Sequence, residues 1–262
     1  MASKAITFDG YDLQNTTFTT KDVVYRNMPS RTIDIEQLSR RDGFRVINAY
    51  YTQKDIRISG NASAASETTL RTALDAMKTA LNKTEKNLDI TDGSTTVRWV
   101  CSVVNIDIPE QHYHITRVPY DITFRCQPFG IATSTTTNTN SMTDTESSSI
   151  VIIGSAQPKP TITWTVSGTP SSAITGITFY NSTTGDTFGV TGLVLSGDTD
   201  YLMLNTDTMS AVYNTGSGDV VVDFSGVIPS FTTSTNSYTT TISGGGASKT
   251  IMQTITYSAS YL

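Results

Sequence analysis

One segment of the chain carries a helical pattern of apolar residues. Between residues 63 and 81, apolar side chains recur at steps of four, three and four positions, which places them on one side of a helix. They are Leu70, Leu74, Met77 and Leu81. Ser63 or Ser66 can cap the start, and the acidic Glu67 suits the positive end of a helix. The spacing predicts one amphipathic helix packed on a sheet.

The rest of the first half alternates as strands do. Thr32, Asp34 and Glu36 fall on one side of residues 32–37, and Ile33, Ile35 and Gln37 fall on the other. This alternation predicts a half-buried strand. Asp42 and Gly43 then form a common hairpin turn sequence. We expect the same sheet to continue through residues 45–51, 53–59, 97–108 and 114–127.

The second half has no helical stripe. Short apolar runs are separated by Gly, Asn, Asp and Ser, the pattern of a β-sandwich. The runs are 150–153, 162–166, 174–180, 201–204 and 220–224. The last strand alternates, with Ile255, Tyr257, Ala259 and Tyr261 on one side. The predicted fold class is mainly β: a β-sandwich with one α-helix, followed by a second β-sandwich.

Residues 131–149 separate these two patterns. They are almost wholly polar and have no period, so we expect either a polar linker or a connecting segment of exposed strand and loop. The expected domains are therefore residues 1–130 and 150–262.

Charge divides the chain at the same place. Of the 18 Lys and Arg residues, 16 lie before position 131, whereas Asp and Glu divide 15 to 8, so the first half is near neutral and the second acidic. The total of −5 gives no general attraction to nucleic acid or anionic lipid. No apolar run reaches the roughly 18 residues of a membrane helix, and residues 1–10 have no signal-peptide character. We expect a soluble protein made in the cytoplasm, with no specific nucleic acid binding and no membrane contact.

Three strings occur in order in the first half. They are Arg40-Arg41-Asp42-Gly43-Phe44, Asp55-Ile56-Arg57-Ile58-Ser59-Gly60 and, after the helix, residues 121–129. In this order they resemble the N-terminal domain of distal tail (Dit) proteins of long-tailed, siphovirus-type bacteriophages.

Five strings of the second half extend the resemblance. They are residues 159–162, 179–185, 197–201, 204–207 and 223–231. Their order is similar to that in the galectin-like C-terminal domains of distal tail proteins. The family often has a Gly-x-Asn turn before its penultimate strand, where this chain has Thr235 and Asn236 without the glycine.

The resemblance implies a structural virion protein of the phage tail tip. It implies a tail-tube-like, ring-forming N-terminal domain, a hexamer around the DNA channel and a galectin-like C-terminal domain. The chain would be a baseplate hub that joins the tail tube to the host-recognition apparatus. Implied partners are the tail tube protein, a tail-tip hub or fibre protein and receptor-binding proteins, with a host glycan as a further candidate. Assembly would take place in the host cytoplasm, and neither enzymatic activity nor a cofactor is expected.

Arg40, Arg41 and Arg45 form the densest basic cluster. Such residues often lie on a solvated turn. Arginine also has a rigid, multidentate donor fork that suits contacts between subunits. We therefore take the three as the candidate subunit interface.

Several patterns resemble sites of chemistry but are better explained by structure. Ser243–Thr250 lacks the glycine that precedes the lysine of a phosphate loop, which predicts a flexible hairpin loop. His112 and His114 have no acidic or cysteine partner at ligand spacing. Asp198, Asp200 and Asp207 lack a calcium-loop pattern, so we expect these three carboxylates to form turns. No catalytic, cofactor or metal residue is predicted.

Cys101 and Cys126 fall on the two strands of the hairpin expected near residue 111. Counting outward from that turn pairs Cys101 with about Thr123, so the two sulfurs should be offset. A cytoplasmic origin also disfavours oxidation. The prediction is two buried thiols.

Two other functions stay open. A carbohydrate-binding adhesin would use exposed aromatic side chains of the second half, for which Trp164, Tyr180 and Tyr238 are candidates. A polysaccharide-degrading enzyme would need two paired carboxylates in a cleft, and nothing singles out two acids of the second half.

Overall fold

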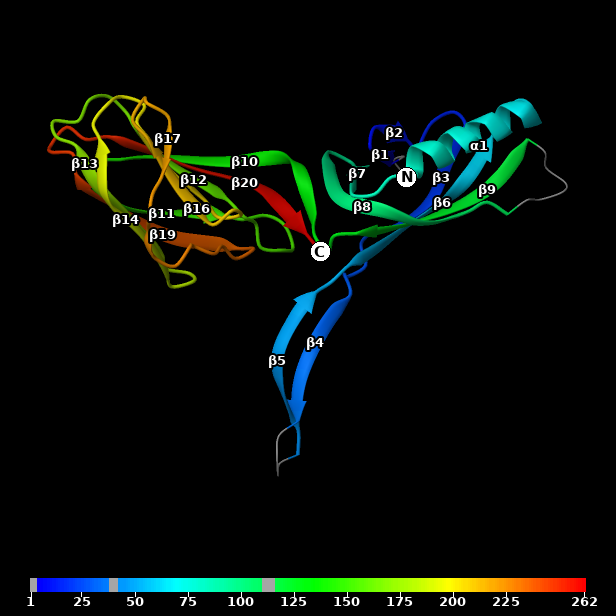
Figure 1. Cartoon of the computed structure of the whole chain (residues 1–262), viewed down its shortest axis with the longest axis horizontal. Helices are drawn as coiled ribbons and strands as arrows, with labels where there is room; N and C mark the ends of the chain where they lie inside the picture. Colours follow the sequence, from blue (N-terminus) through cyan, green and yellow to red (C-terminus); the bar gives the residue numbers. More distant parts are fainter. Residues whose placement is uncertain (1–3, 38–41, 110–115) are drawn as a thin grey trace. The chain divides into compact units, whose positions relative to one another are not determined.

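The computed structural model describes residues 4–37, 42–109 and 116–262, and the chain divides into two compact units (Figure 1). Residues 1–133 with Tyr261–Leu262 form the first unit, and residues 134–260 form the second. Strands dominate both units, and the described ranges contain one α-helix. The predicted fold class, mainly β with one helix, is confirmed. No helix in these ranges is long and apolar enough to cross a membrane.

The first unit is built on an antiparallel sheet with the strand order β3-β6-β9-β8-β7-β1-β2. The strands are β1 (Ala5–Phe8), β2 (Tyr11–Asp12), β3 (Phe18–Val24), β6 (Lys54–Ser63), β7 (Lys86–Asp92), β8 (Thr95–Asp107) and β9 (Arg117–Cys126). Their inward side chains form one apolar core, in which Ile56, Ile58 and Phe124 are fully buried.

Helix α1 (Glu67–Leu81) packs on this core as predicted. Of the two proposed caps, Ser66 is the one used, and its hydroxyl accepts a hydrogen bond from the Thr69 backbone N–H at 3.2 Å. The four buried residues of the helix are Leu70, Leu74, Met77 and Leu81, so the predicted apolar stripe is confirmed.

The second unit contains strands of two sheets. One has the order β17-β16-β15-β12-β20-β10, and the other has the order β11-β19-β13-β14-β18. The strands are β10 (Gly130–Met142), β11 (Thr145–Val151), β12 (Thr161–Val166), β13 (Ile174–Asn181), β14 (Asp186–Leu195), β15 (Tyr201–Asn205), β16 (Ser210–Asn214), β17 (Asp219–Val221), β18 (Ser225–Gly226), β19 (Thr235–Gly244) and β20 (Ile251–Tyr261). Ile255, Tyr257 and Ala259 are buried along β20, as the alternation predicts.

Of the two alternatives for residues 131–149, the structure has the connecting segment of exposed strand and loop and not the linker. Most of residues 131–149 lie in β10 and β11, and the boundary between the two units falls inside β10, after Thr133. Threonine is favoured in strands because its branched Cβ fits the pleated surface while its hydroxyl remains exposed to water. β11 pairs along its whole length with β19, and the hydroxyls of Ser147 and Thr239 lie 2.8 Å apart. A strand exposed on both faces has no apolar alternation, so its sequence looks like a linker.

The cysteine prediction is also wrong, because Cys101 and Cys126 form a disulfide. They lie directly opposite each other on β8 and β9, whereas Thr123 pairs with Asn105. A β-bulge between Val103 and Asn105 shifts the register, and the whole hairpin is offset from the one counted from residue 111. Both cysteines are buried, as expected.

Candidate assembly surface

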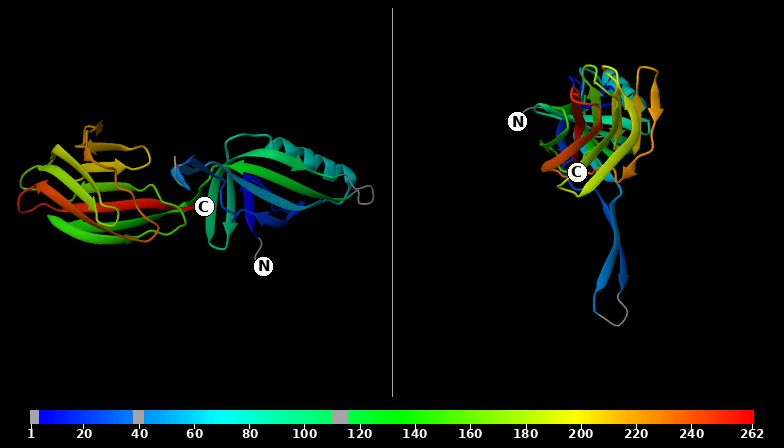
Figure 2. Two further views of the ribbon diagram at one scale, coloured as in Figure 1. Left: turned by 90° about the horizontal axis from the view of Figure 1, so that it is seen from below. Right: turned by 90° about the vertical axis from the view of Figure 1, so that its left-hand side faces the viewer.

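A two-stranded ribbon in the first unit stays uncovered. β4 (Arg31–Gln37) and β5 (Phe44–Tyr51) pair only with each other. No residue of either strand is buried, and Figure 2 shows the ribbon with no other strand beside it. The predicted strands are present, but the prediction that they are half-buried in the main sheet is wrong. Their alternation is real, yet nothing in the described chain covers the apolar side.

The register gives the ribbon one apolar and one polar face. Residues directly opposite each other share a face, and neighbours along a strand alternate. Ile35 lies opposite Val46 and Gln37 opposite Phe44, so the apolar face holds Ile33, Ile35, Phe44 and Val46. These four side chains are 50%, 58%, 61% and 49% exposed. The other face holds Thr32, Asp34, Glu36, Arg45, Asn48 and the exposed Tyr50, and the exposed Ile47 lies at the β-bulge, without a partner in the register.

An uncovered apolar face on a ribbon is energetically unfavourable. Two isolated strands are marginally stable in water at best. Covering the exposed part of each apolar side chain would contribute roughly 1 kcal/mol. Contiguous exposed apolar surface of this kind marks interaction sites in soluble proteins. We therefore take the apolar face of the β4–β5 ribbon as the candidate assembly surface.

Contacts at the base of the ribbon join its two arms to each other and one arm to Phe129 of the first unit. Backbone hydrogen bonds join Ser30 to Gln53 at 2.7 Å and Thr52 to Ser30 at 2.9 Å. The ring of Tyr51 meets the edge of Phe129, with centroids 5.7 Å apart. These contacts hold both strands where they leave the sheet.

Lys54 follows the ribbon at the start of β6 and is buried. Its ammonium lies 5.5 Å from the centre of the Trp99 ring. Burial lowers the pKa of this lysine, because the charged form loses its water. The ring partly replaces that water through a cation–π contact.

Of the three arginines of the predicted basic cluster, Arg45 lies among the described residues. Arg40 and Arg41 lie outside the described residues. Arg45 is exposed on the polar face, opposite Glu36 on β4. It has no ion pair with any residue that the structure describes. Arg45 thus shares the ribbon with the apolar face.

The glycine-rich loop of the second unit does not have a phosphate-loop structure. It is followed by strand β20, and the Lys249 ammonium donates to the Gly244 carbonyl at 3.0 Å and pairs with Asp144 at 3.3 Å. The loop joins β19 to β20 in different sheets, so the expected hairpin is wrong. The lysine closes the loop and does not point outward to an anion.

The three aspartates expected in turns are found in turns. Asp200 accepts hydrogen bonds from the backbone of Ser196 and Gly197, at 2.9 and 2.7 Å. Asp198 accepts from the backbone of Gly168 at 2.7 Å. Asp207 pairs with Lys159 at 2.6 Å. His112 and His114 lie outside the described residues.

Burial separates the three candidate sugar-binding aromatics. Trp164 and Tyr238 are 0% and 1% exposed, and both pack in the core of the second unit. Tyr180 is 42% exposed on β13. Of these three candidates, Tyr180 is the one that is exposed to solvent.

Taken together, these features define a mainly β protein of two units, one of which carries an uncovered amphipathic ribbon. No known protein-family profile matches the sequence, and no curated protein matches it.

Among solved structures, the chain is similar to the Dit protein (gp 19.1) of phage SPP1, described as a paradigm of the hub adsorption apparatus in phages that infect Gram-positive bacteria. The match has a TM-score of 0.67 and 17% sequence identity, and it covers 99% of both chains. A chain of the phage P2 baseplate in its activated conformation with Ca matches at a TM-score of 0.43 and 10% identity, over 91% of this chain and 98% of that one. The chain therefore has the fold of the SPP1 Dit protein along its whole length, and the resemblance to distal tail proteins is confirmed at the level of the fold.

Proposed function

We propose that this chain is a structural hub protein of a phage tail tip. It assembles into a closed ring, of six copies, that joins the tail tube to the host-recognition apparatus. The observation that carries the proposal is the likeness to the SPP1 Dit protein over 99% of both chains, since it includes both units and not one common domain.

The uncovered ribbon supports the self-assembly. Its apolar face requires a cover that the described chain does not supply, and a neighbouring copy is always available in a homo-oligomer. Arg45, with Arg40 and Arg41, would add charged contacts at the same interface. The first unit is thus the ring-forming domain.

The second unit is the docking domain in this proposal. It is acidic and poor in Lys and Arg, so it would contribute little to binding the DNA that passes through a tail. Its partners would be a tail-tip hub or fibre protein and the receptor-binding proteins, while the ring contacts the tail tube protein. The role is assembly and not catalysis.

Immunogold electron microscopy tests the proposal. Antibodies against this chain should label the distal end of the tail in virions of the phage that encodes it. Label on the capsid or along the tail shaft, or virions without label, would contradict the proposal.

A further inference from the structure

Tyr180 stands in the middle of an uncharged sheet face in the second unit. Its strand, β13, is the central strand of the sheet β11-β19-β13-β14-β18 (Figure 1). Residues directly opposite each other share a face, and Tyr180 lies opposite Thr239 on β19 and Thr187 on β14. Thr239 in turn lies opposite Ser147 on β11. The exposed tyrosine ring therefore has hydroxyl side chains on both sides.

The next row of this outer face has the same chemistry. Across the five strands it consists of Thr145, Thr241, Thr178, Gly189 and Ser225. None of the residues that the register places on this face of the five strands is charged. The acidic side chains of the second unit thus leave a neutral face around Tyr180.

Several hydroxyls of the face are free to bind a ligand. Those of Tyr180, Thr178 and Thr187 form no hydrogen bond with any residue that the structure describes. The hydroxyls of Ser147 and Thr239 lie 2.8 Å apart and pair with each other. A hydroxyl donates one hydrogen bond and accepts two, so even these paired groups keep acceptor capacity. The face offers both donors and acceptors to a ligand.

Gly189 leaves a low place in the face beside the tyrosine. It lies diagonal to Tyr180, since it is two residues beyond Thr187 on β14. A Cβ atom at this position would come 3.2 Å from the Ser225 hydroxyl oxygen and 3.7 Å from that of Thr178. The missing side chain leaves room for part of a ligand between these two hydroxyls.

The composition of the face selects one class of ligand. A polyanion such as nucleic acid requires Lys or Arg to neutralise its charge, and this face has neither. Serine is depleted in interfaces between proteins, whereas serine and threonine cover most of this face. A neutral sugar chain matches it, because sugar hydroxyls both donate and accept hydrogen bonds and the C–H side of a sugar ring can pack on an aromatic ring.

We infer that the outer face of the β11-β19-β13-β14-β18 sheet binds a neutral polysaccharide. One sugar ring packs on Tyr180, and the adjoining part of the chain lies over Gly189. The hydroxyls of Thr178, Thr187 and Thr239 hold the sugar hydroxyls on either side of the ring. The site belongs to the second unit alone and does not depend on the proposed ring.

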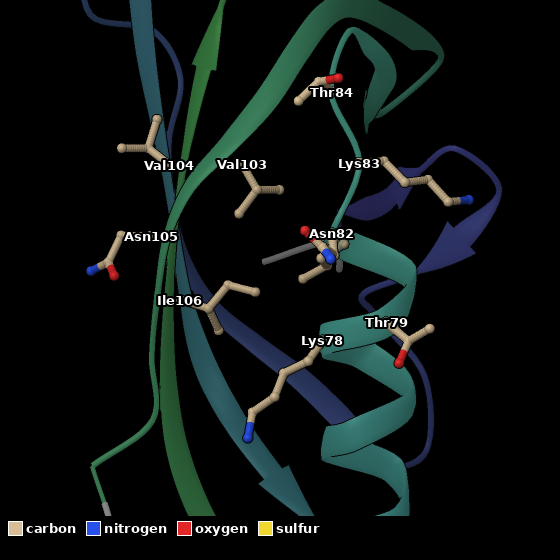
Figure 3. A pocket seen from close by; sticks show the side chains of 10 residues that line it. Lys78, Thr79, Asn82, Lys83, Thr84, Val103, Val104, Asn105 and Ile106 are labelled. Atoms are coloured by element: carbon tan, nitrogen blue, oxygen red, sulfur yellow. The ribbon is translucent and has the colours of Figure 1, made fainter.

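A groove in the first unit has a different character and supplies a control. It has a volume of about 570 Å³ and lies between β8 and the end of α1 (Figure 3). Val103 and Ile106 point from β8 toward the helix and give it an apolar wall. Its two charged side chains are Lys78 and Lys83. An apolar wall with charged neighbours does not match a neutral sugar chain, so this groove should not bind one.

A glycan array probed with the full-length protein tests the inference. The neutral probes are oligosaccharides of glucose, galactose, rhamnose and N-acetylglucosamine, and a glycerol phosphate polymer is the anionic probe. The wild type should bind at least one neutral chain and should not bind the anionic polymer, because the face has no cation. Titration calorimetry with the neutral chain that binds most strongly then gives its Kd.

Variants of the full-length protein locate the site. Tyr180→Ala should raise the Kd about tenfold or more, because the aromatic contact is lost. Tyr180→Phe keeps the ring and should raise the Kd by no more than about threefold. Gly189→Thr fills the low place and should also raise the Kd about tenfold. Lys78→Ala, in the groove of the first unit, is the control and should bind as the wild type does.

Thermal melts show whether each variant is folded, and Tyr180 is an exposed position, so its variants should melt with the wild type. A wild type that binds none of the neutral chains overturns the inference, and so does an unchanged Kd for Tyr180→Ala. A Kd that rises for Lys78→Ala and not for Tyr180→Ala would move the site to the groove and would also overturn it. None of these results bears on the proposed ring, which the sedimentation of the wild type measures separately.

Discussion

Cys101 lies directly opposite Cys126 across strands β8 and β9, with their Cα atoms 4.0 Å apart, and the two side chains form a disulfide. The bond closes a loop with a sequence separation of 25 in the core of the first unit. A closed loop restricts the unfolded chain, and for this length the stabilisation is about 3 kcal/mol.

The double variant Cys101→Ala, Cys126→Ala should therefore unfold at lower denaturant concentration than the wild type. Reductant should lower the stability of the wild type toward that of the variant and leave the variant unchanged. If thiol titration finds two free thiols in the unfolded protein before reduction, the disulfide is absent and the two cysteines are free thiols, as the sequence predicts.

The apolar stripe of α1 gives a second prediction. Leu74→Asp places a charge in the core at a cost of several kcal/mol, which should prevent stable folding. Ala76→Asp puts the same charge on the exposed side of the helix and should change the melting temperature little. Thermal melts followed by circular dichroism compare the two, and equal melts would show that α1 does not pack through this stripe.

Acid sensitivity is expected at Asp186. Burial raises the pKa of its carboxyl, but hydrogen bonds from Ser230 and Thr184 together outweigh burial, so the pKa lies below its ordinary value. The Ser230 hydroxyl and backbone N–H donate at 2.6 and 2.9 Å, and the Thr184 hydroxyl donates at 2.8 Å. A depressed pKa stabilises the fold above the pKa of the unfolded chain, and this stability is lost as pH falls through the folded value.

Asp186→Asn should thus cost on the order of 1 kcal/mol at neutral pH. The difference from the wild type should shrink below about pH 4, where the carboxyl of the unfolded chain also binds a proton. Asp223→Asn, at an exposed position, should track the wild type at every pH. A constant gap between Asp186→Asn and wild type across this range would show that the carboxylate charge is not involved.

The sequence predicts the elements whose apolar pattern shows which side is buried, and it does not predict features that leave no such pattern. The stripe of α1 and the alternation of β20 report which side is buried, and both are confirmed. The register that joins Cys101 to Cys126 depends on a β-bulge, which no residue type requires. β10 and β11 are harder to predict, because strands rich in Thr and Ser that are exposed to water on both faces lack an apolar period.

The ribbon shows a different limit. The alternation of Ile33 and Ile35 with Asp34 correctly predicts a strand with one apolar face. It cannot tell whether that face is covered by the same chain or by another one. The cluster of Phe44 and Val46 beside the turn at Gly43 was the available signal, since it makes a hairpin too apolar for solvent alone.

Charge reversal of the basic cluster should weaken assembly and spare the fold. The variant combines Arg45→Glu with Arg40→Glu and Arg41→Glu. Arg45 is exposed, and a change at an exposed position usually alters stability by about 0.5 kcal/mol or less. Arg71→Glu on the exposed side of α1 is the control. Light scattering should show fewer rings for the cluster variant and no change for the control. Unchanged assembly of the cluster variant would show that these arginines make no subunit contact.

The account depends most on self-assembly of the intact chain, which sedimentation velocity measures directly. Over a wide concentration range, the wild type should give one species with a mass about six times the 28.3 kDa of the chain, as expected for a closed ring. Ile35→Ser with Phe44→Ser, which removes apolar surface from the ribbon, should shift this species toward monomer. A wild type that sediments as a monomer at every concentration, or as polymers that grow without limit, would contradict the account.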